Sequence, residues 1–212
     1  MKIKVCGLKE PGNVGAVAEL GPDYMGFIFY GPSPRYAGGL SIDSLNISGF
    51  ITKTAVFVNE SFDSINAILK KNNFGAVQLH GDESPEFCEL FRDKVKVIKA
   101  FGMSADFDFS QLNRYSDHVN FFLFDTKTDL HGGSGKVFDW SVLEKYTLDV
   151  PFFLSGGLSL DNLEQVKNIV HPMFYGIDLN SKFEDSPGIK NIEKLEKAFE
   201  ISNKILKDEL PG

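Results

Sequence analysis

The sequence contains few cysteines, a single tryptophan and no long apolar run. Two cysteines, Cys6 and Cys88, are too few for a disulfide-stabilised scaffold. No apolar stretch approaches the roughly 18 residues that a membrane-spanning helix needs. The N-terminal residues also lack the apolar segment of a signal peptide. These absences predict a cytoplasmic protein that does not associate with a membrane.

Clustered positive charge is absent as well. The chain has 22 Lys and Arg residues against 29 Asp and Glu, a formal net charge of −7. An acidic chain without a basic patch is not expected to bind nucleic acid or an anionic membrane surface. Linkers and low-complexity segments are missing too, so residues 1–212 are predicted to form one domain. Hydrophobic residues make up 42% of the sequence, which excludes a disordered chain.

The chain does contain a regular alternation of short apolar runs with polar, helix-compatible stretches. Eight runs have the length and composition of strands, at residues 3–6, 24–29, 54–58, 75–79, 95–100, 119–124, 152–154 and 173–177. Residues 61–72 and 192–206 show an apolar helical face, and Ser84-Pro85 predicts a helix start. Eight such units predict a single (β/α)8 TIM barrel. An open doubly wound sheet is disfavoured, because no G-x-G-x-x-G follows the first run.

The active site of a TIM barrel lies at the C-terminal ends of its strands, so the residues at the end of each run are the candidates. In chain order they are Cys6, Tyr30, Asn59, His80, Phe101, Asp125, Ser155 with Gly156 and Gly157, and Asp178. Because we expect apolar strand interiors, the polar residues of this set are predicted to lie at the mouth and not in the barrel core.

Cys6 and Asp125 are the candidates for acid–base chemistry. Cys6 is either a small buried hydrophobe, as most free cysteines are, or a thiolate base or nucleophile. Asp125 directly follows four apolar residues. It either caps the following loop or acts as a general acid whose pKa is raised by its apolar neighbours. Cys88 is predicted to be a core residue.

Three groups are candidates for binding. Gly156-Gly157 and Asn180-Ser181 follow the seventh and eighth runs, where TIM barrels commonly bind phosphate, although glycines also serve simple turns. Arg35 lies in a loop stiffened by two prolines, and it either holds a carboxylate or is solvated at the surface.

His80 is predicted to be structural or to face the substrate, because no metal site of three or four ligands can be assembled around it. The glycine-rich residues 132–136 predict either a mobile cover over the mouth or a flexible connection.

Several short segments together match a known family. They are K-V-C-G-L at 4–8, G-F-I-F at 26–29, S-P-R at 33–35, V-F-V-N at 56–59, V-Q-L-H-G-D-E at 77–83, L-F-D-T at 123–126, G-G-S-G-K-V-F-D-W at 132–140 and L-S-G-G-L at 154–158. Because these segments occur in this order along the chain, the sequence resembles the phosphoribosylanthranilate isomerases of tryptophan biosynthesis over essentially its whole length.

The resemblance implies an Amadori rearrangement that needs neither cofactor nor metal. Its substrate is a phosphorylated small molecule, N-(5-phosphoribosyl)anthranilate, and its product is 1-(2-carboxyphenylamino)-1-deoxyribulose 5-phosphate. By this resemblance Cys6 is the general base, Asp125 is the general acid and Arg35 holds the anthranilate carboxylate. The enzyme would work as a monomer or a homodimer.

The resemblance also assigns the remaining binding residues. Asp178 contacts polar groups of the substrate near the reacting centre, and the phosphate is held by backbone amides around Gly156, Gly157, Asn180 and Ser181. One departure stands out: Lys182 occupies a position where the family more often has glycine. Lysine lacks glycine's easy access to positive φ, so the phosphate contacts after the last strand are expected to differ.

Two alternatives remain at this stage. One is another phosphosugar barrel, such as the histidine-pathway isomerase, which would be expected to carry an aspartate where this chain has Cys6. A pentose-phosphate epimerase would need a set of metal ligands at several strand ends. The other alternative is a non-catalytic phosphate-binding barrel, which the presence of Cys6, Arg35 and Asp125 disfavours.

Overall fold

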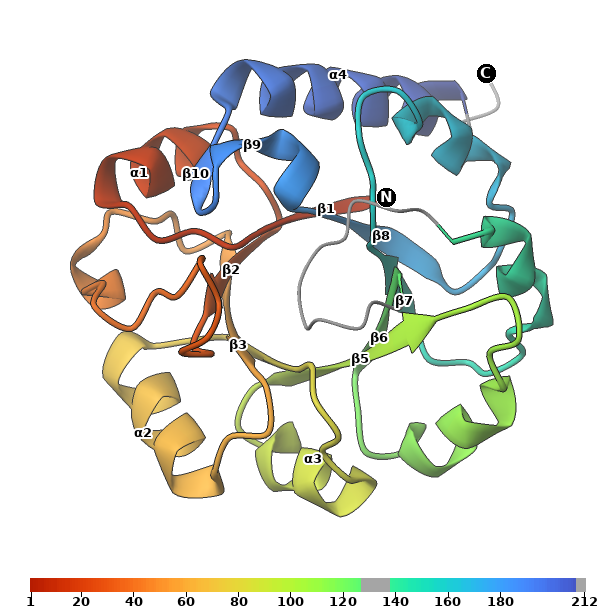
Figure 1. Cartoon of the computed structure of the whole chain (residues 1–212), viewed down its shortest axis with the longest axis horizontal. Coiled ribbons are helices and arrows are strands. Elements are labelled where there is room, and N and C mark those ends of the chain that lie inside the picture. Colours follow the sequence, from red (N-terminus) through yellow and green to blue (C-terminus); the bar gives the residue numbers. More distant parts are fainter. Residues whose placement is uncertain (127–137, 209–212) are drawn as a thin grey trace.

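Eight parallel strands close into a barrel in chain order, with β1 hydrogen-bonded to both β2 and β8 (Figure 1). The computed structural model describes residues 1–126 and 138–208, the last two without their side chains. The strands are β1 (Lys2–Cys6), β2 (Tyr24–Ile28), β3 (Thr52–Phe57), β4 (Ala76–Leu79), β5 (Lys96–Met103), β6 (Phe121–Thr126), β7 (Phe152–Leu154) and β8 (Phe174–Leu179). This confirms the predicted TIM barrel.

Helices surround the barrel on its outer face (Figure 1). Those described are α1 (Pro11–Glu19), α2 (Phe62–Asn72), α3 (Pro85–Arg92) and α4 (Ile192–Asp208). Several connections instead carry short 3-10 helices, namely η1 (Ile42–Ser44), η2 (Phe109–Tyr115), η3 (Trp140–Lys145) and η4 (Leu163–Asn168). The predicted helix start at Ser84 is confirmed, because its hydroxyl accepts a hydrogen bond from the Phe87 amide.

A short hairpin follows β8. It contains η5 (Ser181–Phe183), β9 (Glu184–Ser186) and β10 (Ile189–Lys190), and it lies between the barrel and α1 (Figure 1). The Asn13 side chain on α1 holds β10 through hydrogen bonds to the Lys190 amide and carbonyl, at 2.7 and 2.8 Å. The hairpin therefore brings Glu184 and Lys190 to the edge of the barrel next to β1.

Alternate residues of each strand face opposite sides of the barrel wall. Ile3 and Val5 of β1 pack into the large apolar layer between strands and helices. A second, smaller cluster, including Tyr24, Phe121 and Phe153, fills the inside of the barrel. Lys4 and Cys6 alternate with Ile3 and Val5 and therefore face inward. Within the described residues, no helix is both long and apolar enough to cross a membrane.

Two predictions about the strands were wrong. Phe101, Asp125 and Asp178 do not follow their strands but lie within β5, β6 and β8, because these strands continue beyond the apolar runs that marked them. The barrel interior is also not wholly apolar, since Lys4 and Gln78 are 0% and 1% exposed there. Asp125 and Asp178 extend β6 and β8 without lengthening their apolar runs, which is why composition ended these two strands too early.

Replacing Ser84 by alanine should lower the free energy of unfolding by about 1 kcal/mol, because the amide of Phe87 loses its capping acceptor. Ser84→Asp provides the matched control, since aspartate caps a helix as well as serine does. The measurement is urea denaturation followed by circular dichroism. Equal midpoints for Ser84→Ala and the wild type would show that the cap contributes nothing.

Candidate active site

A narrow cavity of about 60 Å³ opens at the C-terminal ends of the strands. Its lining includes six of the nine predicted site residues: Cys6, Arg35, His80, Asp125, Asp178 and Asn180. The other three, Gly156, Gly157 and Ser181, are not among the lining residues. A larger cavity of about 530 Å³ adjoins it and shares His80 and Asp125. The site thus has a tight floor beside Cys6 and a wider cleft over β4, β5 and β6.

Cys6 lies at the floor of the narrow cavity and is 3% exposed. Burial raises the pKa of its thiol, and the positive charge of Lys4 opposes that rise. Lys4 was not among the site residues predicted from the sequence. Its signal was present in the sequence, because residues two apart in a strand share a face.

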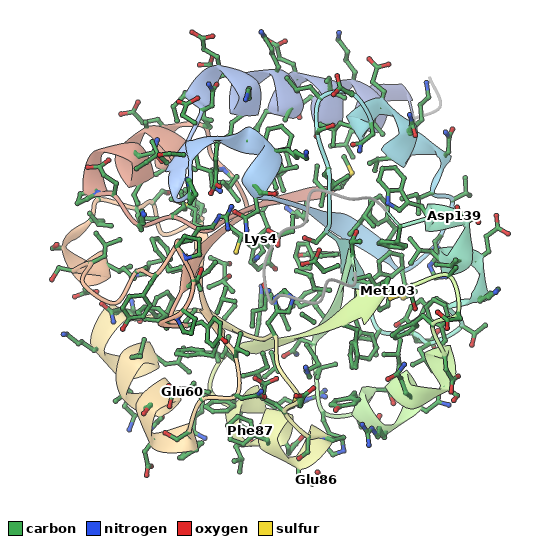
Figure 2. The ribbon with its side chains drawn as sticks, viewed as in Figure 1. Lys4, Glu60, Glu86, Phe87, Met103 and Asp139 are labelled. Atoms are coloured by element: carbon green, nitrogen blue, oxygen red, sulfur yellow. The ribbon has the colours of Figure 1, made fainter. Side chains whose placement is uncertain are left out.

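Lys4, which Figure 2 shows inside the ring of strands, pairs with Asp178 across the seam between β1 and β8. Its Nζ lies 3.0 Å from Asp178 Oδ1, and the two side chains are 0% and 5% exposed. Burial disfavours the ammonium charge, but Asp178 and Cys6 outweigh burial and raise the pKa of Lys4. Lys4 is therefore a permanent buried cation directly below the candidate base.

Asp125 lies at the end of β6 and lines both cavities. Its Oδ1 accepts a hydrogen bond from the Thr126 amide at 2.8 Å, and its Oδ2 lies 3.6 Å from His80 Nε2. Burial, together with the negative charge of Asp178, raises the pKa of Asp125 to about 6. A carboxyl group with this pKa is suited to donate a proton near neutral pH.

His80 is oriented by Gln78, two residues earlier on β4. The Gln78 amide nitrogen lies 3.0 Å from His80 Nδ1. When it donates to Nδ1, the neutral imidazole carries its proton on Nε2, the nitrogen that faces Asp125. Gln78 is 1% exposed, and no described residue bonds its Oε1. Sequence reasoning identified His80 but not its partner.

Arg35 does not lie at the surface: its guanidinium is paired inside the protein with Glu184. Arg35 Nε donates to both Glu184 oxygens at 2.9 and 3.0 Å, and Nη2 donates at 2.7 Å. Lys190 Nζ binds the same carboxylate at 2.7 Å and Asn180 Oδ1 at 2.8 Å. Although burial works to raise it, these two cations hold the pKa of Glu184 below its ordinary value. Glu184 and Lys190 were not predicted from the sequence.

Gly7 permits this cluster to approach β1. It has φ +81°, and a Cβ there would lie 2.7 Å from both Arg35 Cδ and Asn180 Oδ1. Any other residue at position 7 would displace these two side chains. The Cys6-Gly7 pair at the end of β1 therefore provides the thiol and leaves room for Arg35 and Asn180 beside it.

Gly156 follows β7 with φ +83° and packs directly against the acid. A Cβ at this position would lie 2.4 Å from the Thr126 amide nitrogen and 2.7 Å from Asp125 Oδ1. Ser181 begins η5, and Lys182, the departure noted above, is exposed. Residues 132–136, including the predicted cover, lie outside the described residues. Over the described part of the chain, no three His, Cys, Asp or Glu side chains gather as a metal site.

A family model for N-(5'phosphoribosyl)anthranilate (PRA) isomerase matches residues 3–201 of this chain. Curated relatives bear the same name. The one from Parabacteroides distasonis is 43% identical, covering 92% of this chain and 90% of its own. The one from Thermotoga neapolitana is 40% identical, covering 90% and 93%.

Solved structures agree with the sequence comparisons. The phosphoribosyl anthranilate isomerase of Thermotoga maritima superposes with a TM-score of 0.85 at 31% identity, over 96% of this chain and 99% of that one. Another, in complex with reduced 1-(o-carboxyphenylamino)-1-deoxyribulose 5-phosphate, gives 0.81 at 28% identity, over 96% and 99%. The chain belongs to the N-(5'-phosphoribosyl)anthranilate isomerase family, the intramolecular aldose–ketose isomerases of tryptophan biosynthesis.

Proposed function

We propose that this isomerase uses Asp125 as its general acid and Cys6 as its general base. The observation that carries the proposal is their placement on β6 and β1, lining one narrow cavity, with the pKa of Asp125 raised to about 6. Ring opening needs a proton donor and enolisation needs an acceptor, and a bound sugar can lie between the two side chains. Each proton transfer is worth about 10²–10⁴-fold in rate.

The chemistry proceeds in three steps that together involve four proton transfers. Asp125 protonates the furanose ring oxygen, the bond from that oxygen to C1' breaks, and a Schiff base forms between C1' and the anthranilate nitrogen. The Cys6 thiolate then removes the proton from C2', and the electron pair moves to the nitrogen to give an enolamine. Finally the 2'-hydroxyl loses its proton and C1' gains one, which yields the ketone. No net proton is gained or lost.

The remaining residues hold the substrate in this proposal. Arg35 binds the anthranilate carboxylate; among the described residues, none bonds its Nη1, so a second carboxylate can be accepted there. The phosphate is held around Gly156, Gly157, Asn180 and Ser181. Asp178 and His80 line the cavity beside the reacting carbons.

The proposal also covers the domain organisation, the cellular location and the oligomeric state of the enzyme. We infer one domain over residues 1–212, because the eight strands close one barrel. The enzyme is proposed to be cytoplasmic, to need no cofactor, and to act as a monomer or homodimer. A Thermotoga maritima relative is described as a dimeric enzyme from which monomers were generated.

The function is tested by following the fluorescence of phosphoribosylanthranilate, generated in situ by the preceding transferase from anthranilate and phosphoribosyl pyrophosphate. Purified protein in the presence of EDTA should accelerate the decay of the substrate signal. A folded protein that leaves the decay at its spontaneous rate would refute the isomerase activity.

Asp125→Asn should lower kcat by about 10²–10⁴-fold, because the amide is isosteric but cannot donate the ring-opening proton. The pH dependence of the folding stability of this variant provides a control, because the direction of the expected change is fixed. Since the folded pKa of about 6 exceeds the ordinary 3.8, ionisation of Asp125 destabilises the wild type as pH rises between these values. The variant should therefore become more stable than the wild type as the pH rises above 3.8, by up to about 3 kcal/mol at pH 6 and above. Near-normal kcat would eliminate Asp125 as the acid.

Cys6→Ser should reduce kcat by at least about 100-fold, because a hydroxyl group ionises far less readily than a thiol and supplies almost no anionic base near neutral pH. Cys88→Ser is the matched control: Cys88 is buried on α3 and should tolerate the change without loss of turnover. Steady-state kinetics of the two variants provide the comparison. Equal activity of Cys6→Ser and the wild type would return Cys6 to the role of a plain buried residue.

Arg35→Ala should raise KM by about tenfold or more and change kcat much less, because a charge-assisted contact to the substrate carboxylate is lost. Arg35→Lys should lie between the two, since it keeps the charge but loses the two-pronged geometry. Kinetics with purified variants separate KM from kcat. An unchanged KM in Arg35→Ala would mean that Arg35 serves only to bind Glu184.

A further inference from the structure

The buried cation at Lys4 is not explained by the needs of the fold. Its ammonium is 0% exposed and lies inside the ring of strands (Figure 2). Removing an ammonium from water costs several kcal/mol even when it is paired. Elsewhere the barrel interior is filled by apolar and aromatic residues, such as Phe121, Leu123 and Phe153. A well-packed apolar residue at position 4 would avoid this cost.

The position of Lys4 on β1 places it beside the candidate base. Lys4 and Cys6 are two residues apart on one strand and therefore project from the same face. Lys4 Nζ is hydrogen-bonded to Asp178 Oδ1 at 3.0 Å, and its positive charge favours the thiolate of Cys6. One ammonium thus lies against a carboxylate on the strand face that also carries the thiol.

The charges around Cys6 oppose each other. Burial and the carboxylate of Asp178 disfavour its thiolate, whereas Lys4 and Lys190 favour it. Lys190 is already committed to Glu184 and Asn180, at 2.7 and 2.8 Å. The other titratable or charged groups lining the same cavity are Tyr30, Arg35, His80 and Asp125. Lys4 shares the inward face of β1 with Cys6, and its charge is the larger of the two that favour the thiolate.

We propose that Lys4 is the positioning residue that makes Cys6 a base, because its ammonium, held by Asp178 on the inward face that carries the thiol, becomes the counter-ion of the thiolate during enolisation. This inference rests on the proposed role of Cys6. It assigns Asp178 a second part: the carboxylate keeps Lys4 charged in the resting enzyme and competes with the thiolate for it.

The test is a titration of the Cys6 thiol in Lys4→Met, by the ultraviolet absorbance of the thiolate and by the rate of alkylation with iodoacetamide. Without the ammonium, the thiol pKa should rise by at least about one unit, and alkylation near neutral pH should slow at least about tenfold. Cys88 does not interfere, because burial raises its pKa to about 12. In kinetics, kcat should fall by a similar factor and stay low as the pH rises, because ionisation of Asp125 offsets the gain in thiolate, with KM changed little.

Asp178→Asn provides a second variant, which should shift the thiol pKa in the opposite direction. It removes the negative charge that opposes the thiolate and releases Lys4 to pair with sulfur, so the thiol pKa should fall and alkylation should accelerate. A merely structural role of the ion pair predicts the same disturbance from either variant and not opposite shifts. This variant also keeps the test decisive if Lys4→Met fails to fold.

Lys99→Met is the matched control. Lys99 is 1% exposed and paired with Glu83 at 3.2 Å. It alternates on β5 with the inward-facing Ile98 and Ala100, so it faces away from Cys6. Its removal deletes a comparable buried cation and should leave the thiol titration unchanged.

The outcomes separate the inference from the function on which it rests. An unchanged thiol titration in Lys4→Met, with Cys6→Ser inactive, would overturn the role of Lys4 and leave Cys6 as the base. The role of Lys4 would also be overturned by equal shifts of the thiol pKa in Lys4→Met and Lys99→Met. It would be overturned as well if Lys4→Met and Asp178→Asn shifted the thiol pKa in the same direction. Full activity of Cys6→Ser would instead remove the base assignment, whatever the titration gives.

Discussion

The buried ion pair between Lys4 and Asp178 joins the first strand of the barrel to the last. The two residues are direct partners in the register of β1 and β8, and their charged atoms meet at 3.0 Å inside the barrel. Removing either partner would leave an unpaired charge in the interior, which is strongly destabilising. Because Cys6 follows Lys4 on the same face, the ion pair at the closing seam of the barrel also sets the charge beside the candidate base.

The same pair explains how an acid and a base can coexist in one desolvated cavity. Burial raises the pKa of Asp125 to about 6 and that of Cys6 above its ordinary 9.0. Near neutral pH, the dominant form therefore carries its proton on sulfur and not on the carboxyl. The reactive form, a thiolate facing a carboxylic acid, is therefore a minor fraction of the molecules before substrate binds. The positive charge of Lys4 raises the fraction of molecules in the reactive form, and a substrate that displaces water changes that fraction further.

The sequence predicted the barrel well because its outer wall follows simple rules. Apolar runs of strand length and the helix starts at Ser61 and Ser84 are local features, and the structure has them where they were expected. The thiol and the carboxyl were identified because they stand at strand ends. The charges that tune them were missed because they depend on long-range pairing: Lys4 meets a residue 174 positions away, and Arg35 meets one 149 positions away.

The narrow cavity also shows why strand ends were placed too early. Asp125 and Asp178 are polar residues that face inward from β6 and β8, so an apolar run stops before the strand does. Gln78 continues the same inward polar layer on β4 and orients His80. Such a layer can be anticipated only when residues two apart are read together on a strand that is known to face the barrel axis.

The central claim is that Asp125 and Cys6 act as a pair, with Asp125 protonated and Cys6 ionised in the reactive form. The pH dependence of kcat/KM tests this claim most directly. If the carboxylic acid and the thiolate are both required, their opposing titrations cancel between the two pKa values, and kcat/KM should form a plateau from about pH 7 to about pH 9. The phosphate of the substrate is fully ionised in that range, since its second pKa is about 6. A steady fall of about tenfold per pH unit above pH 7 would show that the acid acts without a thiolate base and would contradict the account.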